Sequence, residues 1–150
     1  MKSFTTILSA IDFSENSDYA FGYAVSIASV FNSNLVIMHV IDNLLYAPGF
    51  DMPYTFIEDL DKEFYESAKK KMAIFCESRL TGISNYSTTI ETGTPYKEII
   101  LTAEKTAASL IVLGTHGRSG LDRVVFGSTA ERVVRKAPCP VLTVPLHKDA

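Results

Sequence analysis

The sequence contains no tryptophan and only two cysteines, Cys76 and Cys139, among its 150 residues. With three histidines, they form neither a C-x-x-C pair nor the four-ligand spacing of a structural zinc site. We therefore expect two buried free thiols and no metal site made by protein side chains alone.

Long apolar runs and an excess of positive charge are also missing. No run approaches the roughly 20 apolar residues needed to cross a bilayer. The segment Met1–Thr6 leads into a strand-like run rather than a signal peptide. The formal net charge is −3, whereas nucleic-acid binding depends on basic surface, and we interpret the triplet Lys69–Lys71 as a solvated helix face. The expectation is a cytoplasmic protein that binds neither membranes nor nucleic acids.

What the sequence does contain is a regular alternation of short apolar runs and amphipathic segments. At 150 residues, one domain spanning residues 1–150 is expected. Alternating strands and helices predict a parallel sheet covered by helices on both faces. The expected strands cover residues 7–11, 35–41, 86–92, 110–113 and 141–144, and the expected helices begin after Ser14, near Ile57, at Pro95 and at Ser128.

A long connection, Asp42–Thr55, separates the second strand from the second helix. It contains Pro48, Gly49 and Pro53 but also several large apolar side chains. Structureless loops of this length are uncommon and are often functional. Its apolar content predicts that it packs on a ligand, a partner or the domain itself.

The segment Gly114–Thr129 combines three features that suit phosphate. Glycines at 114 and 117 allow the backbone to approach a ligand closely. The start of a helix at 127–129 offers unpaired N–H groups and partial positive charge, and Arg118 and Arg123 add positive charge nearby. In open α/β sheets, ligands bind outside the carboxyl ends of the strands, which is where this loop is expected.

These residues by themselves leave alternatives open. Ser128 and Glu131 fit a capping box, which needs no ligand, and neither a P-loop motif nor G-x-G-x-x-G is present. Asp12 is either part of the site or an ordinary helix-entry residue. His116 either contacts phosphate or points to solvent, and His39 is expected to be a core or supporting residue.

The glycine spacing is more specific. Gly114, two residues, Gly117, nine residues and then Gly127–Ser128 resemble G-x2-G-x9-G-[ST], the nucleotide-binding motif of the universal stress protein family. The resemblance extends over the chain and is carried by residues 7–14, 35–42, 93–95 and 138–145.

This resemblance implies a three-layer α/β/α fold of the Rossmann-like, adenine nucleotide alpha hydrolase-like type. Its five parallel strands would have the order 3-2-1-4-5. It also implies bound ATP, with ADP or AMP as alternatives, together with Mg²⁺ or Mn²⁺. A homodimer joined through Val141–Val144 is a further implication, since exposed strand edges favour pairing.

The family's binding residues correspond to positions in three loops. Asp12 would contact the ribose, Ala10 and Ile11 would line the adenine pocket, and the backbone of Val40 would bond to adenine. Gly114 and Gly117 would pass beneath the ribose and α-phosphate, and Gly127, Ser128 and Thr129 would hold the β- and γ-phosphates. Thr115, His116 and Arg118 complete the predicted site.

The expected function is an ATP-binding regulatory or stress-response protein. Efficient phosphoryl transfer needs a group that positions the nucleophile, and Asp12 and Asp122 are the only carboxylates expected nearby. We therefore expect slow or no hydrolysis and assign no catalytic residue. The alternatives are a weak ATPase and a nucleotide-independent dimeric scaffold or chaperone-like protein. Adenylating enzymes are disfavoured because residues 11–15 lack their Ser-Gly-Gly-x-Asp-Ser motif.

Overall fold

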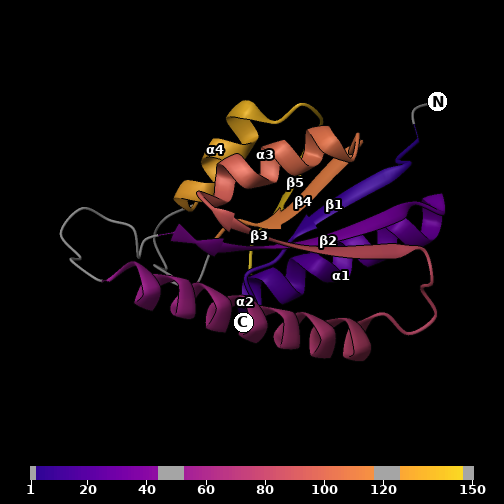
Figure 1. Cartoon of the computed structure of the whole chain (residues 1–150). Helices are drawn as coiled ribbons and strands as arrows, with labels where there is room; N and C mark the ends of the chain where they lie inside the picture. Colours follow the sequence, from indigo (N-terminus) through magenta and orange to yellow (C-terminus); the bar gives the residue numbers. More distant parts are fainter. Residues whose placement is uncertain (1–2, 44–52, 117–125, 147–150) are drawn as a thin grey trace.

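The computed structural model describes residues 3–43, 53–116 and 126–146. Within them, strands and helices alternate in chain order (Figure 1). The strands are β1 (Thr6–Ala10), β2 (Asn34–Asp42), β3 (Tyr86–Gly93), β4 (Leu110–Gly114) and β5 (Val141–Val144), and the helices are α1 (Glu15–Phe31), α2 (Tyr54–Arg79), α3 (Pro95–Lys105) and α4 (Ser128–Lys136). No helix in the described part of the chain is both long and apolar enough to cross a membrane.

The five strands form one parallel sheet with the order β3-β2-β1-β4-β5, which confirms the predicted topology. Figure 1 shows α1 and α2 on one face of this sheet and α3 and α4 on the other. The chain leaves the neighbouring strands β1 and β4 toward opposite faces, because β1 leads into α1 and β4 leads to α4. The carboxyl ends of β1 and β4 therefore flank the switch point at which ligands bind in such folds.

Two apolar clusters hold the three layers together. Alternate residues of the central strands point to opposite faces, so Ile7 packs with α1 and α2 while Leu8 packs with α3 and α4. Both side chains are completely buried. Full burial of a side chain of this size contributes about 1.5–3 kcal/mol, which explains the continuous apolar runs of strands covered on both faces.

The second helix differs most from its sequence-based description. It begins at Tyr54 and ends at Arg79, and its buried residues, Ala68, Met72, Phe75 and Cys76, all lie in the second half. The helical spacing of apolar residues in the sequence predicts one apolar face made of Ile57, Leu60, Phe64, Ala68, Met72 and Phe75. In the structure this face is buried only from Ala68 onward, and Phe64 is 42% exposed. At 26 residues and about 1.5 Å per residue, α2 is long enough to continue past the packed core.

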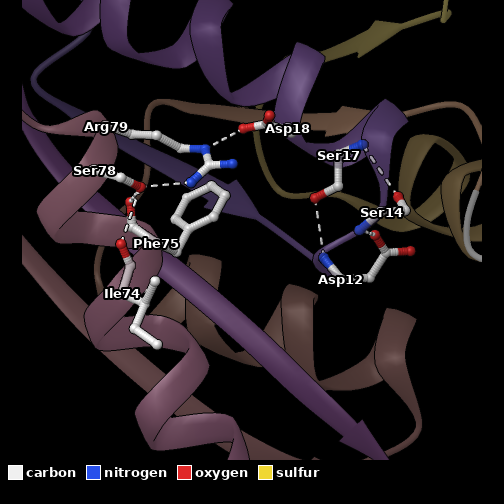
Figure 2. Close-up of polar contacts among 8 residues, drawn as sticks. All are labelled: Asp12, Ser14, Ser17, Asp18, Ile74, Phe75, Ser78 and Arg79. Carbon is white, nitrogen blue, oxygen red and sulfur yellow. Dashed lines mark hydrogen bonds and ion pairs between the residues drawn. The ribbon is translucent and has the colours of Figure 1, made fainter.

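A polar contact attaches the packed half of α2 to α1. Arg79 forms an ion pair with Asp18, and its guanidinium carbon lies 4.3 Å from the ring centroid of Phe75 (Figure 2). The hydrogen bond to Asp18, together with the negative charge of that carboxylate, raises the pKa of Arg79. The contact fixes one end of α2, whereas the other end reaches the carboxyl edge of the sheet.

Candidate functional site

A cavity of about 760 Å³ lies at the carboxyl edge of the sheet. Its volume falls within the range of small-molecule and cofactor sites, about 300–1,000 Å³. The ends of β1, β2 and β4 form its floor, and α2, α3 and α4 contribute walls. The lining residues are Ala10–Phe13, Ser17, Met38–Asp42, Phe64, Ser67, Ala68, Lys71, Pro95, Ile99, Leu113–His116 and Gly127–Ala130.

The residues predicted for the site come together in this cavity, although their segments are far apart in the sequence. Those that line it are Ala10, Ile11, Asp12, Val40, Gly114, Thr115, His116, Gly127, Ser128 and Thr129. Gly117 and Arg118 lie outside the described residues, as do Asp122, Arg123 and most of the predicted 42–55 loop. The arrangement brings the first strand, the second strand and the start of α4 around one space.

The first helix turn fixes the position of Asp12 (Figure 2). Oδ1 of Asp12 accepts a 3.0 Å hydrogen bond from the Ser14 N–H, and the Asp12 N–H donates to Oγ of Ser17 at 3.0 Å. Ser14 is the N-cap of α1, as predicted, and its hydroxyl accepts from the Ser17 N–H. Asp12 is therefore both a helix-entry residue and a wall of the cavity.

Phe13 and His39 support the same corner. Phe13 has a φ of 63°, a left-handed conformation that costs a bulky residue about 1–3 kcal/mol and is found most often at functional sites. Its ring lies 4.6 Å from the ring of His39 and 6.0 Å from that of Phe75. Packing against these rings compensates for the strain.

His39 is buried, and its Nδ1 lies 2.8 Å from the carbonyl oxygen of Ile11. Because a carbonyl can only accept, Nδ1 carries the proton in this contact. The hydrogen bond ties β2 to the segment after β1, which confirms the supporting role predicted for His39. It also holds Ile11 and Asp12 beside the cavity.

The two ends of the 115–127 segment are bonded to each other. The Gly127 N–H donates to the carbonyl oxygen of Thr115 at 2.5 Å, and the Thr115 N–H donates to the carbonyl oxygen of Val144 at 3.1 Å. Oγ1 of Thr115 lies 2.9 Å from Nδ1 of His116, so the His116 ring contacts protein rather than only solvent. The start of α4 is thereby fixed beside the end of β4.

The predicted capping box is wrong. Gly127, with φ −69° and ψ 161°, is the N-cap of α4, and no side chain makes a capping hydrogen bond. Ser128 is already the first helical residue, and Glu131 forms an ion pair with Arg135 at 2.8 Å. The first amides of a helix have no intrahelical acceptor, so this helix start presents donors and partial positive charge to the cavity.

The second helix contributes a cavity wall that the sequence-based analysis missed. Phe64, Ser67 and Lys71 line the cavity, and Nζ of Lys71 lies 6.0 Å from the ring centroid of Phe13. Neither of the ion pairs found among the described residues involves Lys71. A spacing of seven residues between Phe64 and Lys71 places both on one helix face, a signal that the solvated-face interpretation overlooked. Asp42 also lines the cavity.

Both cysteines are free and lie away from this lining. Cys76 is buried and Cys139 is half-buried, and burial raises the pKa of both thiols. Thiols of this kind are poor nucleophiles at neutral pH. No group of three or more His, Cys, Asp or Glu side chains in the described ranges comes close enough to hold a metal ion.

The comparisons with known proteins identify consistent relatives. The model of the Universal stress protein family matches residues 3–145. Universal stress protein MJ0531 of Methanocaldococcus jannaschii is 37% identical over 126 residues, which cover 81% of this chain and 71% of that protein.

Solved structures agree with this match. Universal stress protein UspA from Lactobacillus plantarum is 32% identical to this chain and superimposes on it with a TM-score of 0.83. The match covers 96% of this chain and 99% of that protein's chain. A universal stress protein solved in complex with cAMP is 24% identical, with a TM-score of 0.61 and coverage of 96% and 98%. At that identity the likeness shows a shared fold.

Proposed function

Since the chain belongs to the universal stress protein family, we propose that it is an ATP-binding regulatory protein of the stress response. The observation that carries the proposal is the shared cavity, in which Asp12 and the uncapped start of α4 line one space at the switch point. Asp12 is suited to a ribose hydroxyl, and the start of α4 is suited to phosphates. ADP and AMP would use the same groups.

The apolar part of the cavity is suited to adenine. Ala10, Ile11, Met38 and Val40 line it, and the ladder between β1 and β2 ends at Ala10 and Met38. The last residues of β2 therefore extend beyond β1 at the cavity floor. This supports the proposed hydrogen bond from the backbone of Val40 to adenine.

The polar part of the cavity is suited to phosphates. Gly127, Ser128 and Thr129 line it from the start of α4, where N–H groups and the helix dipole favour anions. We propose that Mg²⁺ or Mn²⁺ accompanies the nucleotide and is held mainly by its phosphates. Asp12 and Asp42 are the carboxylates among the lining residues.

Slow or absent hydrolysis is part of the proposal. Phosphoryl transfer requires a group that orients the attacking water, and Asp12 already accepts the Ser14 N–H. The arrangement favours holding a nucleotide over cleaving it. A turnover near 1 per second would contradict this part of the proposal.

The relative solved with cAMP supports an adenine nucleotide only at the level of the fold, since it shares 24% of its residues with this chain. It indicates that a protein of this architecture can hold such a ligand.

A second copy of the chain is the proposed partner. β5 forms one edge of the sheet, and Val141, Leu142 and Thr143 are only half-buried. An apolar edge of this kind favours strand pairing. A nucleotide-independent dimeric scaffold is the competing function, because it would use the same edge without the cavity.

The proposal is tested by identifying the nucleotide that acid releases from the purified protein and by thermal unfolding with ATP and magnesium. At 100 times its dissociation constant, ATP should stabilise the fold by about 2.7 kcal/mol. No released nucleotide and no thermal shift at millimolar ATP would favour the scaffold.

A further inference from the structure

The side chain of Asn16 is buried beside Gly114 and His116, where β4 leads into the 115–127 segment. It is 4% exposed, and both ends of its amide are bonded. Oδ1 accepts the His116 N–H at 2.8 Å, and Nδ2 donates to the carbonyl oxygen of Val144 at 3.0 Å. One side chain of α1 therefore joins the residue after Thr115 to the last residue of β5, which lie 100 and 128 positions from Asn16 in the sequence.

Gly114 is shaped to accommodate this amide. A Cβ on Gly114 would lie 2.7 Å from Oδ1 and 2.8 Å from Cγ of Asn16, closer than real Cβ contacts. Its backbone is not in the left-handed region. The glycine that opens the motif therefore has a local reason besides close approach to a ligand, because it makes room for Asn16.

The bonds around Asn16 converge on the Thr115–His116 peptide. The carbonyl oxygen of Val144 accepts from both Asn16 and the Thr115 N–H, and the Thr115 carbonyl accepts the Gly127 N–H. Asn16 thus fixes the Thr115–His116 backbone, and the Thr115 carbonyl in turn fixes Gly127, the N-cap of α4. Movement of either end of this chain of bonds would break one of these hydrogen bonds.

We propose that Asn16 is a positioning residue for the phosphates of the bound nucleotide, acting through the Thr115–His116 backbone and linking it to the end of β5. The inference rests on the proposed function and deepens it. An asparagine suits the place because it is donor and acceptor at once. Ionised aspartate would lose the donor and direct a charge at the Val144 carbonyl.

The first experiment measures ATP and adenosine affinities by calorimetry for the wild type, Asn16→Ala and Asn16→Asp. Because it loses the bonds to both the His116 N–H and the Val144 carbonyl, Asn16→Ala should weaken ATP binding about tenfold. Adenosine, which has no phosphate, should bind within about twofold of the wild type. Asn16→Asp keeps an acceptor for the His116 N–H but loses the donor to Val144, so it should also weaken ATP binding while adenosine affinity stays within about twofold of the wild type.

The control is Ala24→Gly at a completely buried position on the same helix, where glycine destabilises the helix without touching the bonds around Asn16. It should lower the unfolding temperature without changing either affinity. If the wild type and Asn16→Ala bind ATP equally, the positioning role is wrong and the proposed function stands. If the wild type binds no nucleotide, the proposed function fails and the role fails with it.

A double-mutant cycle on stability tests the geometry even where Asn16→Ala binds poorly. Gly114→Ala should destabilise the wild type through the clash with Asn16, and should cost less when combined with Asn16→Ala. Additive effects of the two substitutions would show that the amide does not determine the glycine, and would overturn this part of the inference.

Discussion

At the scale of single residues, hydrogen bonds and ring contacts hold Asp12, Phe13 and His39 beside the cavity at the end of β1. Asp12 is fixed by the Ser14 N–H, and His39 is fixed by the Ile11 carbonyl. Phe13 supports both through a strained backbone and two ring contacts. The sequence indicated Asp12 and His39, but a left-handed φ at a phenylalanine depends on the packed rings around it and has no local signal.

Cys76 gives a prediction at this scale. Its pKa is raised by burial, so above the ordinary pKa of a thiol, about 8.5, the folded protein retains a proton that the unfolded chain releases. Stability should therefore fall as pH rises above that value. Urea denaturation at pH 7.5 and 9.5 should show a larger loss for the wild type than for Cys76→Ala. Equal losses would show that burial does not hold this thiol neutral.

At the scale of elements, α2 has two halves with different surroundings. The half from Ala68 onward packs on the sheet and is bonded through Arg79 to α1, whereas the half before it carries no buried residue. The helical period of apolar residues continued into the first half, so the sequence predicted one face for the whole helix. Where the sheet ends cannot be inferred from the period of a helix.

Lys71 tests whether the α2 wall contacts the ligand. Lys71→Glu should weaken ATP binding about thirtyfold, because reversing the charge removes one attraction and adds one repulsion, each of about 1 kcal/mol at about 4 Å in water. Rising salt should reduce the difference from the wild type, and adenosine affinity should change little. Fluorescence or calorimetric titration at two salt concentrations provides the measurement.

Lys69→Glu is the matched control, since Lys69 lies on the same helix, is exposed and does not line the cavity. It makes the same change in net charge. Equal effects from both variants would mean that Lys71 acts through long-range charge alone and does not contact the ligand.

The start of α4 shows a different limit of sequence-based prediction. Ser128 and Glu131 have the right spacing for a capping box, yet the helix begins one residue earlier than that motif requires, with Gly127 as N-cap. The Thr115 carbonyl takes the Gly127 N–H and so sets the helix start. This tertiary bond, which the sequence pattern does not encode, excludes the capping box, and the phosphate role of the helix start is part of the proposed function.

At the scale of the whole molecule, the order of the strands was the most predictable feature. Alternating strands and helices imply a parallel sheet, and the family resemblance implied the order that the structure has. The contact between Asn16 and Val144 was not predictable, because it links residues 128 positions apart and no local sequence pattern pairs them.

The proposed dimer can be tested at the outer edge of β5. The carbonyl oxygens of Pro140 and Val144 accept from Ile111 of β4 and from Thr115 just after it. The alternation of a parallel ladder then turns the N–H of Thr143 toward the open edge. Thr143→Pro removes an outward donor and retains the ladder with β4. The variant should be monomeric in light scattering at concentrations where the wild type and Thr143→Val are dimeric. A dimeric Thr143→Pro protein would place the interface elsewhere.

The most direct test of the central claim is a calorimetric titration of ATP with magnesium into the wild type and Gly127→Val. We expect one site per chain in the wild type, with a dissociation constant near 1 μM, or about −8 kcal/mol. We expect no binding to Gly127→Val, whose backbone φ of −69° tolerates a side chain while the added bulk occupies the proposed phosphate position. Unchanged affinity in that variant, or no binding to the wild type, would contradict the account.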